Sequence, residues 1–354
     1  MITYLIIAAV KSALVLFVLL TAVAYTVWLE RKVVGRMQNR WGPTRVGPFG
    51  LLQPLADGIK FILKEDLTPP GAHEVLFILA PLIAVVLALT AISVIPFGGN
   101  ITVGPWTTSL EITGGPAGGD INIALLILLG VTSIAVYGVA LAGWSSNSKY
   151  SLLGSLRASA QMISYELSLG LSLVGVLILA GSLSLRDIVN AQSTQQNGHY
   201  LGFLPHWYIF PQLIGFFIYL VSAYAETNRI PFDLPEAETE LVAGYHTEYS
   251  SMKFAMFFMA EYTNMVTVAS VATLLFFGGW HGPVAHGLPP IVQALVPVFW
   301  FCLKVFFFIF LYIWVRGTLP RFRYDQLMAF GWKVLLPLAI ANIIVTGLIV
   351  ALGS

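Results

Sequence analysis

The chain has 354 residues, of which 57% are hydrophobic and only 10% charged, and its mean hydropathy is +0.82. A surface that faces water needs far more charge, so this composition excludes a soluble globular protein and indicates a membrane protein. The single cysteine, Cys302, lies in an apolar run. One cysteine excludes an intramolecular disulfide, and it excludes thiolate iron–sulfur or zinc sites built from this chain alone.

Eight apolar stretches along the chain are each about as long as the roughly 20 residues that a helix needs to cross a bilayer. They cover roughly 4–29, 75–95, 121–143, 158–181, 207–225, 255–277, 291–315 and 333–352. No internal repeat or low-complexity linker divides them. We therefore predict an all-α integral membrane protein of eight transmembrane helices in a single membrane domain, residues 1–354.

Basic residues are distributed unevenly between these stretches. The loops after the first, third, fifth and seventh stretches hold 15 of the 18 lysines and arginines. Cytoplasmic loops of membrane proteins carry such an excess of positive charge. The sequence therefore predicts that these four loops are cytoplasmic and that both termini lie on the outer side.

The first cytoplasmic loop, residues 30–74, has two parts. From Glu30 to Pro48 it is rich in Gly, Pro and Arg, which predicts a tight non-helical course with planar donors suited to carboxylates. By itself, such a basic loop could also be an orientation signal or a patch for anionic lipid. Residues 51–64 have apolar positions at helical spacing, with Asp57 and Lys60 on the opposite face, which predicts an interfacial amphipathic helix. That helix could anchor the chain to the lipid surface or form the floor of a cavity.

The loop at residues 226–254 holds six of the chain's 17 acidic residues, with Arg229 as the only fixed cation nearby. The six are Glu226, Asp233, Glu236, Glu238, Glu240 and Glu248. Pro231 and Pro235 prevent one continuous helix, and neighbouring carboxylates raise one another's pKa, so these groups could exchange protons near neutral pH. A solvated acidic loop and a docking site for another subunit are the alternatives.

Two further carboxyls, Glu166 and Glu261, fall inside predicted spans, where an ionisable group costs at least about 2.5 kcal/mol and is a functional candidate. With Glu226 at the end of the fifth span, they predict a line of carboxyls from the cytoplasmic loop into the bilayer. His246 is interpreted as a structural imidazole. The histidines show no paired metal-ligand spacing, so no metal site is predicted. No haem-type His pair occurs within the spans, so we expect that the chain carries no electrons.

Four charged motifs follow one another in the sequence: Glu30–Gly50, Ala142–Gly154, Glu226–Tyr249 and Leu319–Gln326. In this order they resemble the H-type membrane subunit (subunit 1) family of respiratory NADH:quinone oxidoreductase, complex I. The resemblance covers essentially the whole chain. It implies an eight-span subunit that links the quinone-reducing peripheral arm to the proton-pumping membrane arm, with FMN and iron–sulfur clusters in partner subunits and no cofactor bound by this chain.

The resemblance also implies roles for individual residues. Arg36 matches a position that lines the quinone tunnel, Asp57 and Lys60 lie at its entrance, and Phe232 and Arg229 are assigned to the same quinone-binding set. The six acids of the loop match the acidic segment beneath the tunnel, and Glu166 and Glu261 match intramembrane carboxyls of a proton path. Some relatives have an acid in the third span where this chain has Ser133, so a proton path there would need water or a partner's acid.

The sequence therefore predicts a subunit of proton-translocating NADH:quinone oxidoreductase in a bacterial inner membrane. Its expected partners are cluster-bearing peripheral subunits, small membrane subunits, quinone and lipid, but no nucleic acid. Two alternatives stay open. An ion-coupled secondary transporter would predict an internal repeat and paired broken helices, which the sequence lacks. A membrane anchor of a related hydrogenase complex would bring nickel with its soluble arm.

Overall fold

The computed structural model describes residues 2–103, 106–109, 121–193, 205–233, 243–283 and 290–353. In this part of the chain, seven helices are long and apolar enough to cross a membrane, and an eighth apolar helix is shorter. The long helices are α1 (Ile2–Met37), α3 (Glu74–Ser93), α4 (Ala124–Ser145), α5 (Lys149–Ala180), α10 (Ser251–Phe276), α11 (Pro290–Thr318) and the last helix, which comprises α12 (Tyr324–Phe330), a π-helical turn (Gly331–Leu335) and α13 (Leu336–Gly353).

The shorter apolar helix is α8 (Leu213–Glu226), which lies in the predicted fifth span. Its 14 residues rise only about 21 Å, less than the hydrocarbon thickness of about 30 Å. The helix begins two residues after Pro211 and ends before Pro231, as the prolines on both sides of this stretch suggested. Every predicted span thus contains a helix, but the fifth is short for a membrane crossing.

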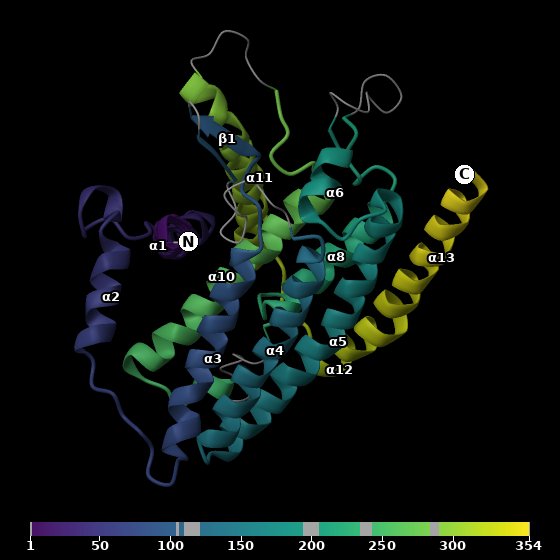
Figure 1. The fold of residues 1–354 in the computed structure, drawn as a ribbon. Coiled ribbons are helices and arrows are strands. Elements are labelled where there is room, and N and C mark those ends of the chain that lie inside the picture. The colour runs from purple at the N-terminus through teal and green to yellow at the C-terminus, as the bar shows by residue number, and fades with distance from the viewer. Residues whose placement is uncertain are drawn as a thin grey trace.

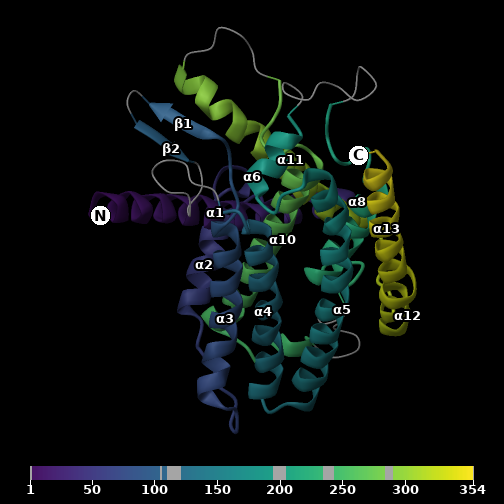
Figure 2. The ribbon, with the colours of Figure 1, turned by 45° about the vertical axis from the view of Figure 1, so that its right-hand side comes forward.

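The helices run back and forth between two ends of a bundle (Figures 1 and 2). The connection between α4 and α5 lies at one end, whereas α6 (Leu185–Ala191) and the C-terminus lie at the other. Helix α1 is an exception, because it crosses the bundle instead of running along it (Figure 2). It contacts α10, α11 and α2 (Gln53–Leu63).

The structure corrects two predictions about local structure. Helix α1 continues to Met37, so residues 30–37 are helical and do not follow the predicted non-helical course. Glutamate, lysine and arginine are good helix formers, and the first proline comes only at Pro43. The predicted all-α class is confirmed for the bundle, but one connection also contains an antiparallel hairpin of β1 (Asn100–Val103) and β2 (Trp106–Ser109). Its isoleucine, valine, threonine and tryptophan residues favour strands.

The predicted amphipathic helix is confirmed as α2, within the predicted range of 51–64. Pro54 lies in its first turn, where the missing N–H is tolerated. Leu55, Ile59 and Ile62 are exposed on its apolar face. In the isolated chain, this face is available to lipid or to another subunit.

Helices α3, α4 and α5 pack closely through small residues. A Cβ at Gly138 of α4 would lie 3.1 Å from the Ala84 nitrogen of α3, and a Cβ at Gly143 would lie 2.1 Å from Ser155 Oγ of α5. Without a hydrophobic driving force between helices in lipid, close backbone approach supplies the van der Waals contact that holds them together. Helix α5 also packs against α8 and α13, so it connects the two sides of the molecule.

One intramembrane charge has a structural role. Lys304 of α11 donates hydrogen bonds to the carbonyl oxygens of Phe277 (2.8 Å), Gly279 (2.8 Å) and His281 (2.7 Å). These carbonyls belong to the end of α10 and the turn after it, where they have no helical partner. Lys304 therefore caps the C-terminal end of a neighbouring helix.

Candidate functional site

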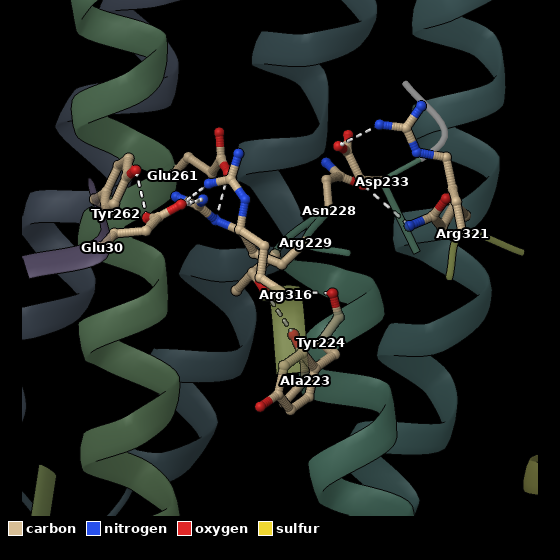
Figure 3. A network of polar contacts seen from close by, with 12 residues as sticks. Glu30, Ala223, Tyr224, Asn228, Arg229, Asp233, Glu261, Tyr262, Arg316 and Arg321 are labelled. Atoms are coloured by element: carbon tan, nitrogen blue, oxygen red, sulfur yellow. Dashed lines mark hydrogen bonds and ion pairs between the residues drawn. The ribbon is translucent and has the colours of Figure 1, made fainter. Parts of the chain in front are cut away.

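A cluster of buried ion pairs lies where α1, α10 and the start of the acidic loop meet (Figure 3). Arg229 Nε lies 2.7 Å from Glu261 Oε1, and Arg229 Nη1 lies 3.4 Å from Glu30 Oε1. The side chains of Arg229 and Glu30 are each 8% exposed, and that of Glu261 is 12% exposed. Arg229 therefore joins a carboxylate at the end of the first span to one in α10.

Two further side chains complete the cluster. Arg316 of α11 forms an ion pair with Glu30, and the Tyr262 hydroxyl donates a hydrogen bond of 2.7 Å to Glu30 Oε2. The Arg229 guanidinium also lies 4.1 Å from the centre of the Tyr262 ring, within the range of a cation–π contact. Two carboxylates thus face two guanidinium groups, so the charge is balanced, which is what burial of ionised groups requires.

An open cavity of about 460 Å³ adjoins this cluster. Its walls come from the last turns of α1, the loop after it, and α11; they consist of Glu30, Arg31, Val34, Gly35, Arg40, Trp41, Gly42, Pro43 and Arg316. Glu30 and Arg316 therefore belong to the buried cluster and also line the cavity. A polar molecule in this cavity would contact the ion pairs directly.

The beginning of the acidic segment is held by residues from distant parts of the sequence. Arg321 Nη2 lies 3.2 Å from Asp233 Oδ2, and the Phe322 ring stacks on the Phe232 ring with centroids 5.6 Å apart. Gln161 Nε2 of α5 donates hydrogen bonds of 2.8 Å to the carbonyl oxygens of Ala225 and Phe232. The prediction that Arg229 is the only fixed cation near the acidic loop was wrong, because Arg321 and Arg316 reach this region from the loop after α11 and its last turn.

The other intramembrane carboxyls, Glu166 and Glu226, have no ion-pair partner within the described ranges. Glu166 accepts a short hydrogen bond from Ser133, the serine that replaces an acid in the third span. Glu226 is the last residue of α8. Among the described residues, Glu261 is thus ion-paired, whereas Glu166 and Glu226 form no ion pair.

The residues assigned to the first loop lie apart from the buried cluster. Arg36 is exposed, with its guanidinium 4.0 Å from the centre of the Trp41 ring. Asp57 pairs with Arg31 at 2.7 Å and lies 4.0 Å from Lys60. Within the described residues, Arg36 thus contacts an aromatic ring and Arg31 contacts the interfacial helix.

Three of the predicted acids, Glu236, Glu238 and Glu240, lie outside the described residues. Glu248 follows the short helix η2 (Gly244–His246) and is half-buried. His246 is buried among Tyr245, Phe257 and Phe258. Burial lowers the pKa of its imidazole to about 3, so the ring is neutral at physiological pH, as expected of a structural histidine.

Sequence reasoning missed four members of the site: Glu30, Tyr262, Arg316 and Arg321. Glu30 carried a usable signal, because it is an acid at the end of an apolar span, followed directly by two basic residues. Arg316 counted only towards orientation, and Arg321 towards orientation and the Leu319–Gln326 motif, because nothing in the sequence shows which loops meet in space. Among the described residues, no group of three or more His, Cys, Asp or Glu side chains could hold a metal ion.

The fold and this site define a helical membrane protein with a charge-balanced cluster buried between its helices and a cavity that adjoins it. A family model described as NADH dehydrogenase matches residues 10–347. The chain is 74% identical to the second H-type NADH-quinone oxidoreductase subunit of Koribacter versatilis, covering 99% of this chain and 98% of the relative. It is also 48% identical to the first H-type subunit of Solibacter usitatus, again over 99% and 98%, and 52% identical to the first H-type subunit of Geobacter sulfurreducens, over 100% and 97%.

The chain therefore belongs to the family of H-type subunits of NADH-quinone oxidoreductase, the membrane subunits of bacterial complex I. The resemblance stated from the four motifs is confirmed, as are the multi-pass membrane location and the place within an oxidoreductase complex. Neither the transporter nor the hydrogenase anchor is supported by these relatives.

Proposed function

We propose that this chain forms the membrane-side part of a quinone-binding tunnel and couples quinone reduction to proton translocation. The observation that carries the proposal is the cavity of about 460 Å³, whose wall includes Glu30 and Arg316 of the buried ion-pair cluster. A group that changes charge in this cavity would act on Glu30 directly. Through Arg229, a change at Glu30 would also reach Glu261 in the membrane.

Quinone reduction would act on the membrane carboxyls through charge. A quinone that has accepted two electrons takes up two protons, and a protonated carboxyl that supplies one of them becomes a carboxylate with a new negative charge. An ion pair that balanced before the reaction is then unbalanced, and Arg229 can shift its pairing between Glu30 and Glu261. The loop acids and Glu166 and Glu226 would exchange protons as that balance changes.

The proposal includes eight membrane crossings with both termini on the outer side, so α8 counts as a crossing despite its length. Arg36, Asp57, Lys60, Arg229 and Phe232 stay assigned to quinone binding as a hypothesis, to which the cavity adds Glu30, Arg31, Arg40, Trp41 and Arg316. FMN and iron–sulfur clusters would belong to peripheral partner subunits. Small membrane subunits would lie beside the exposed helix faces.

The proposal is tested with Glu226→Gln and Glu240→Gln in the whole complex. Both variants should assemble normally and lower NADH-driven quinone reduction, because each removes a carboxyl that exchanges protons. Glu65→Gln, which changes an exposed carboxyl of the first loop, is the matched control and should leave turnover unchanged. Normal turnover in both loop variants would refute the coupling role.

A further inference from the structure

The loop between α11 and α12, residues 319–323, contacts residues 231–233 near the start of the acidic loop (226–254). Three different contacts join them: the Arg321–Asp233 ion pair at 3.2 Å, the Phe322–Phe232 ring stack, and a hydrogen bond of 3.1 Å from the Phe322 amide to the Pro231 carbonyl oxygen. The interplanar angle of the two rings is 12°. Because these three contacts involve consecutive residues, they fix both the distance between the two segments and their relative orientation.

The burial of these partners indicates that the contact is not a surface ion pair. The Asp233 side chain is 8% exposed and the Arg321 side chain 35%, and Phe232 is buried. An exposed ion pair contributes little to stability because water screens it. A buried carboxylate, by contrast, is costly to leave without its cationic partner. Two residues further along, Arg323 and Asp325 form a 3.1 Å pair with side chains 75% and 71% exposed.

The same short segment, Pro231–Asp233, lies between the buried cluster and the rest of the acidic loop. Arg229, two residues earlier, binds Glu30 and Glu261. The carbonyl oxygens of Ala225 and Phe232 both accept from Gln161, which holds the other side of this turn to α5. Gln161 of α5 therefore holds one side of the turn that ends at Asp233, and Arg321 and Phe322 hold its other side.

We propose that Arg321 and Phe322 are positioning residues that hold the start of the acidic segment, so that movement of the α11–α12 loop and of this segment is coupled. The inference rests on the proposed function, and neither residue lines the cavity. Loss of the Arg321–Asp233 pair should therefore slow proton-coupled turnover without weakening quinone binding, whereas loss of the Phe322 ring also removes a packing partner of Phe232, which is assigned to quinone binding.

The test compares Arg321→Gln with Arg323→Gln in the intact complex, at varied quinone concentrations. Arg321→Gln should lower kcat about threefold or more and leave the KM for quinone unchanged, whereas Arg323→Gln should change neither. Arg321→Lys, which keeps the charge, should recover part of kcat. A normal kcat in Arg321→Gln, or a raised KM with unchanged kcat, would overturn the positioning role.

A double-mutant cycle separates coupling from two independent effects. If Arg321 and Asp233 act as a pair, the double variant Arg321→Gln/Asp233→Asn should be no slower than the slower single variant. Effects that multiply would overturn the proposal. Hydrogen exchange of the peptide covering residues 226–233 should increase in Arg321→Gln but not in Arg323→Gln, and equal exchange in both would contradict it.

A second variant covers failure of assembly. Should Arg321→Gln not incorporate, Phe322→Leu removes the stacked ring but keeps an apolar side chain, and the same loss of kcat is expected. A normal kcat in Phe322→Leu would then overturn the proposal. The proposed function has its own test in Glu226→Gln and Glu240→Gln, so slow loop variants beside a normal Arg321→Gln would remove only the positioning role.

Discussion

At the scale of single residues, Arg229 is the member of the site on which most of the charge balance depends. Among the residues that the structure describes, Arg229 is the cation that pairs with Glu261. Glu30, by contrast, also pairs with Arg316 and accepts a hydrogen bond from the Tyr262 hydroxyl. Removal of Arg229 would therefore leave Glu261 as a buried carboxylate without compensation, while Glu30 would keep a cation. The two carboxylates differ in how much they rely on the same arginine.

This asymmetry predicts the result of a double-mutant comparison. Arg229→Met should destabilise the subunit by about 3–5 kcal/mol, because it leaves an uncompensated buried charge. Adding Glu261→Gln should restore part of that loss, since it removes the stranded charge. Thermal unfolding of the purified complex, followed through this subunit, measures both effects.

The control for this comparison is Arg323→Met, whose partner Asp325 is exposed and should need no compensation. A cost of about 0–1 kcal/mol is expected there. If Arg229→Met/Glu261→Gln were no more stable than Arg229→Met, the idea that Glu261 depends on Arg229 would be wrong.

At the scale of elements, the last helix is held to its neighbours by polar contacts in an apolar setting. Gln212, just before α8, donates to Thr346 Oγ1 at 2.7 Å and accepts from Asn342 Nδ2 at 2.8 Å. Gly175 of α5 leaves the space for this arrangement, because a Cβ there would lie 2.4 Å from Gln212 Oε1. Helices α5, α8 and α13 therefore meet at one polar contact that fixes their register.

Gly175→Ala should break this contact, because the new methyl group displaces the Gln212 side chain. Loss of two buried hydrogen bonds predicts destabilisation of about 1–3 kcal/mol, measured as a lower unfolding midpoint or as faster proteolysis of the C-terminal helix. Gly170→Ala in the same helix is the matched control, since a Cβ there meets nothing within 4 Å. It should be neutral or slightly stabilising, and equal destabilisation by both variants would contradict this account.

The elements also show how far the sequence alone could lead. The apolar stretches and the α2 pattern predicted helices correctly because period and length depend on local sequence. The end of α1 was placed too early because the glycines and prolines between Glu30 and Pro48 were taken to exclude a helix, and the β1–β2 hairpin was missed. The partners of the acids, Glu30 with Arg316 and Asp233 with Arg321, could not be predicted, since each pair joins residues 88 or more positions apart whose contact depends on how the helices cross.

At the scale of the whole molecule, several helices have wide exposed faces in the isolated chain. In the most apolar 18-residue stretch of α1, only 17% is buried. The same share is buried in the last helix, against 61% in α10. Helix α10 thus lies inside the bundle, and α1 and α13 lie at its margins. Lipid or partner subunits must cover these marginal faces in the complex, because apolar surface of this extent is unstable in water.

The number of crossings depends on α8, which is short, and on α1, which lies across the bundle (Figure 2). Sites on either side of α8 test whether it crosses the membrane. A Cys302→Ser background has no other cysteine, so single cysteines can report the two sides. Asn190→Cys, exposed in α6 before α8, should react with a membrane-impermeant maleimide from the outer side only. Met252→Cys, 46% exposed in the first turn of α10, should react from the cytoplasmic side only. Labelling of both from one side would show that α8 does not cross the membrane, which would leave seven crossings, place the two termini on opposite sides and refute the proposed orientation.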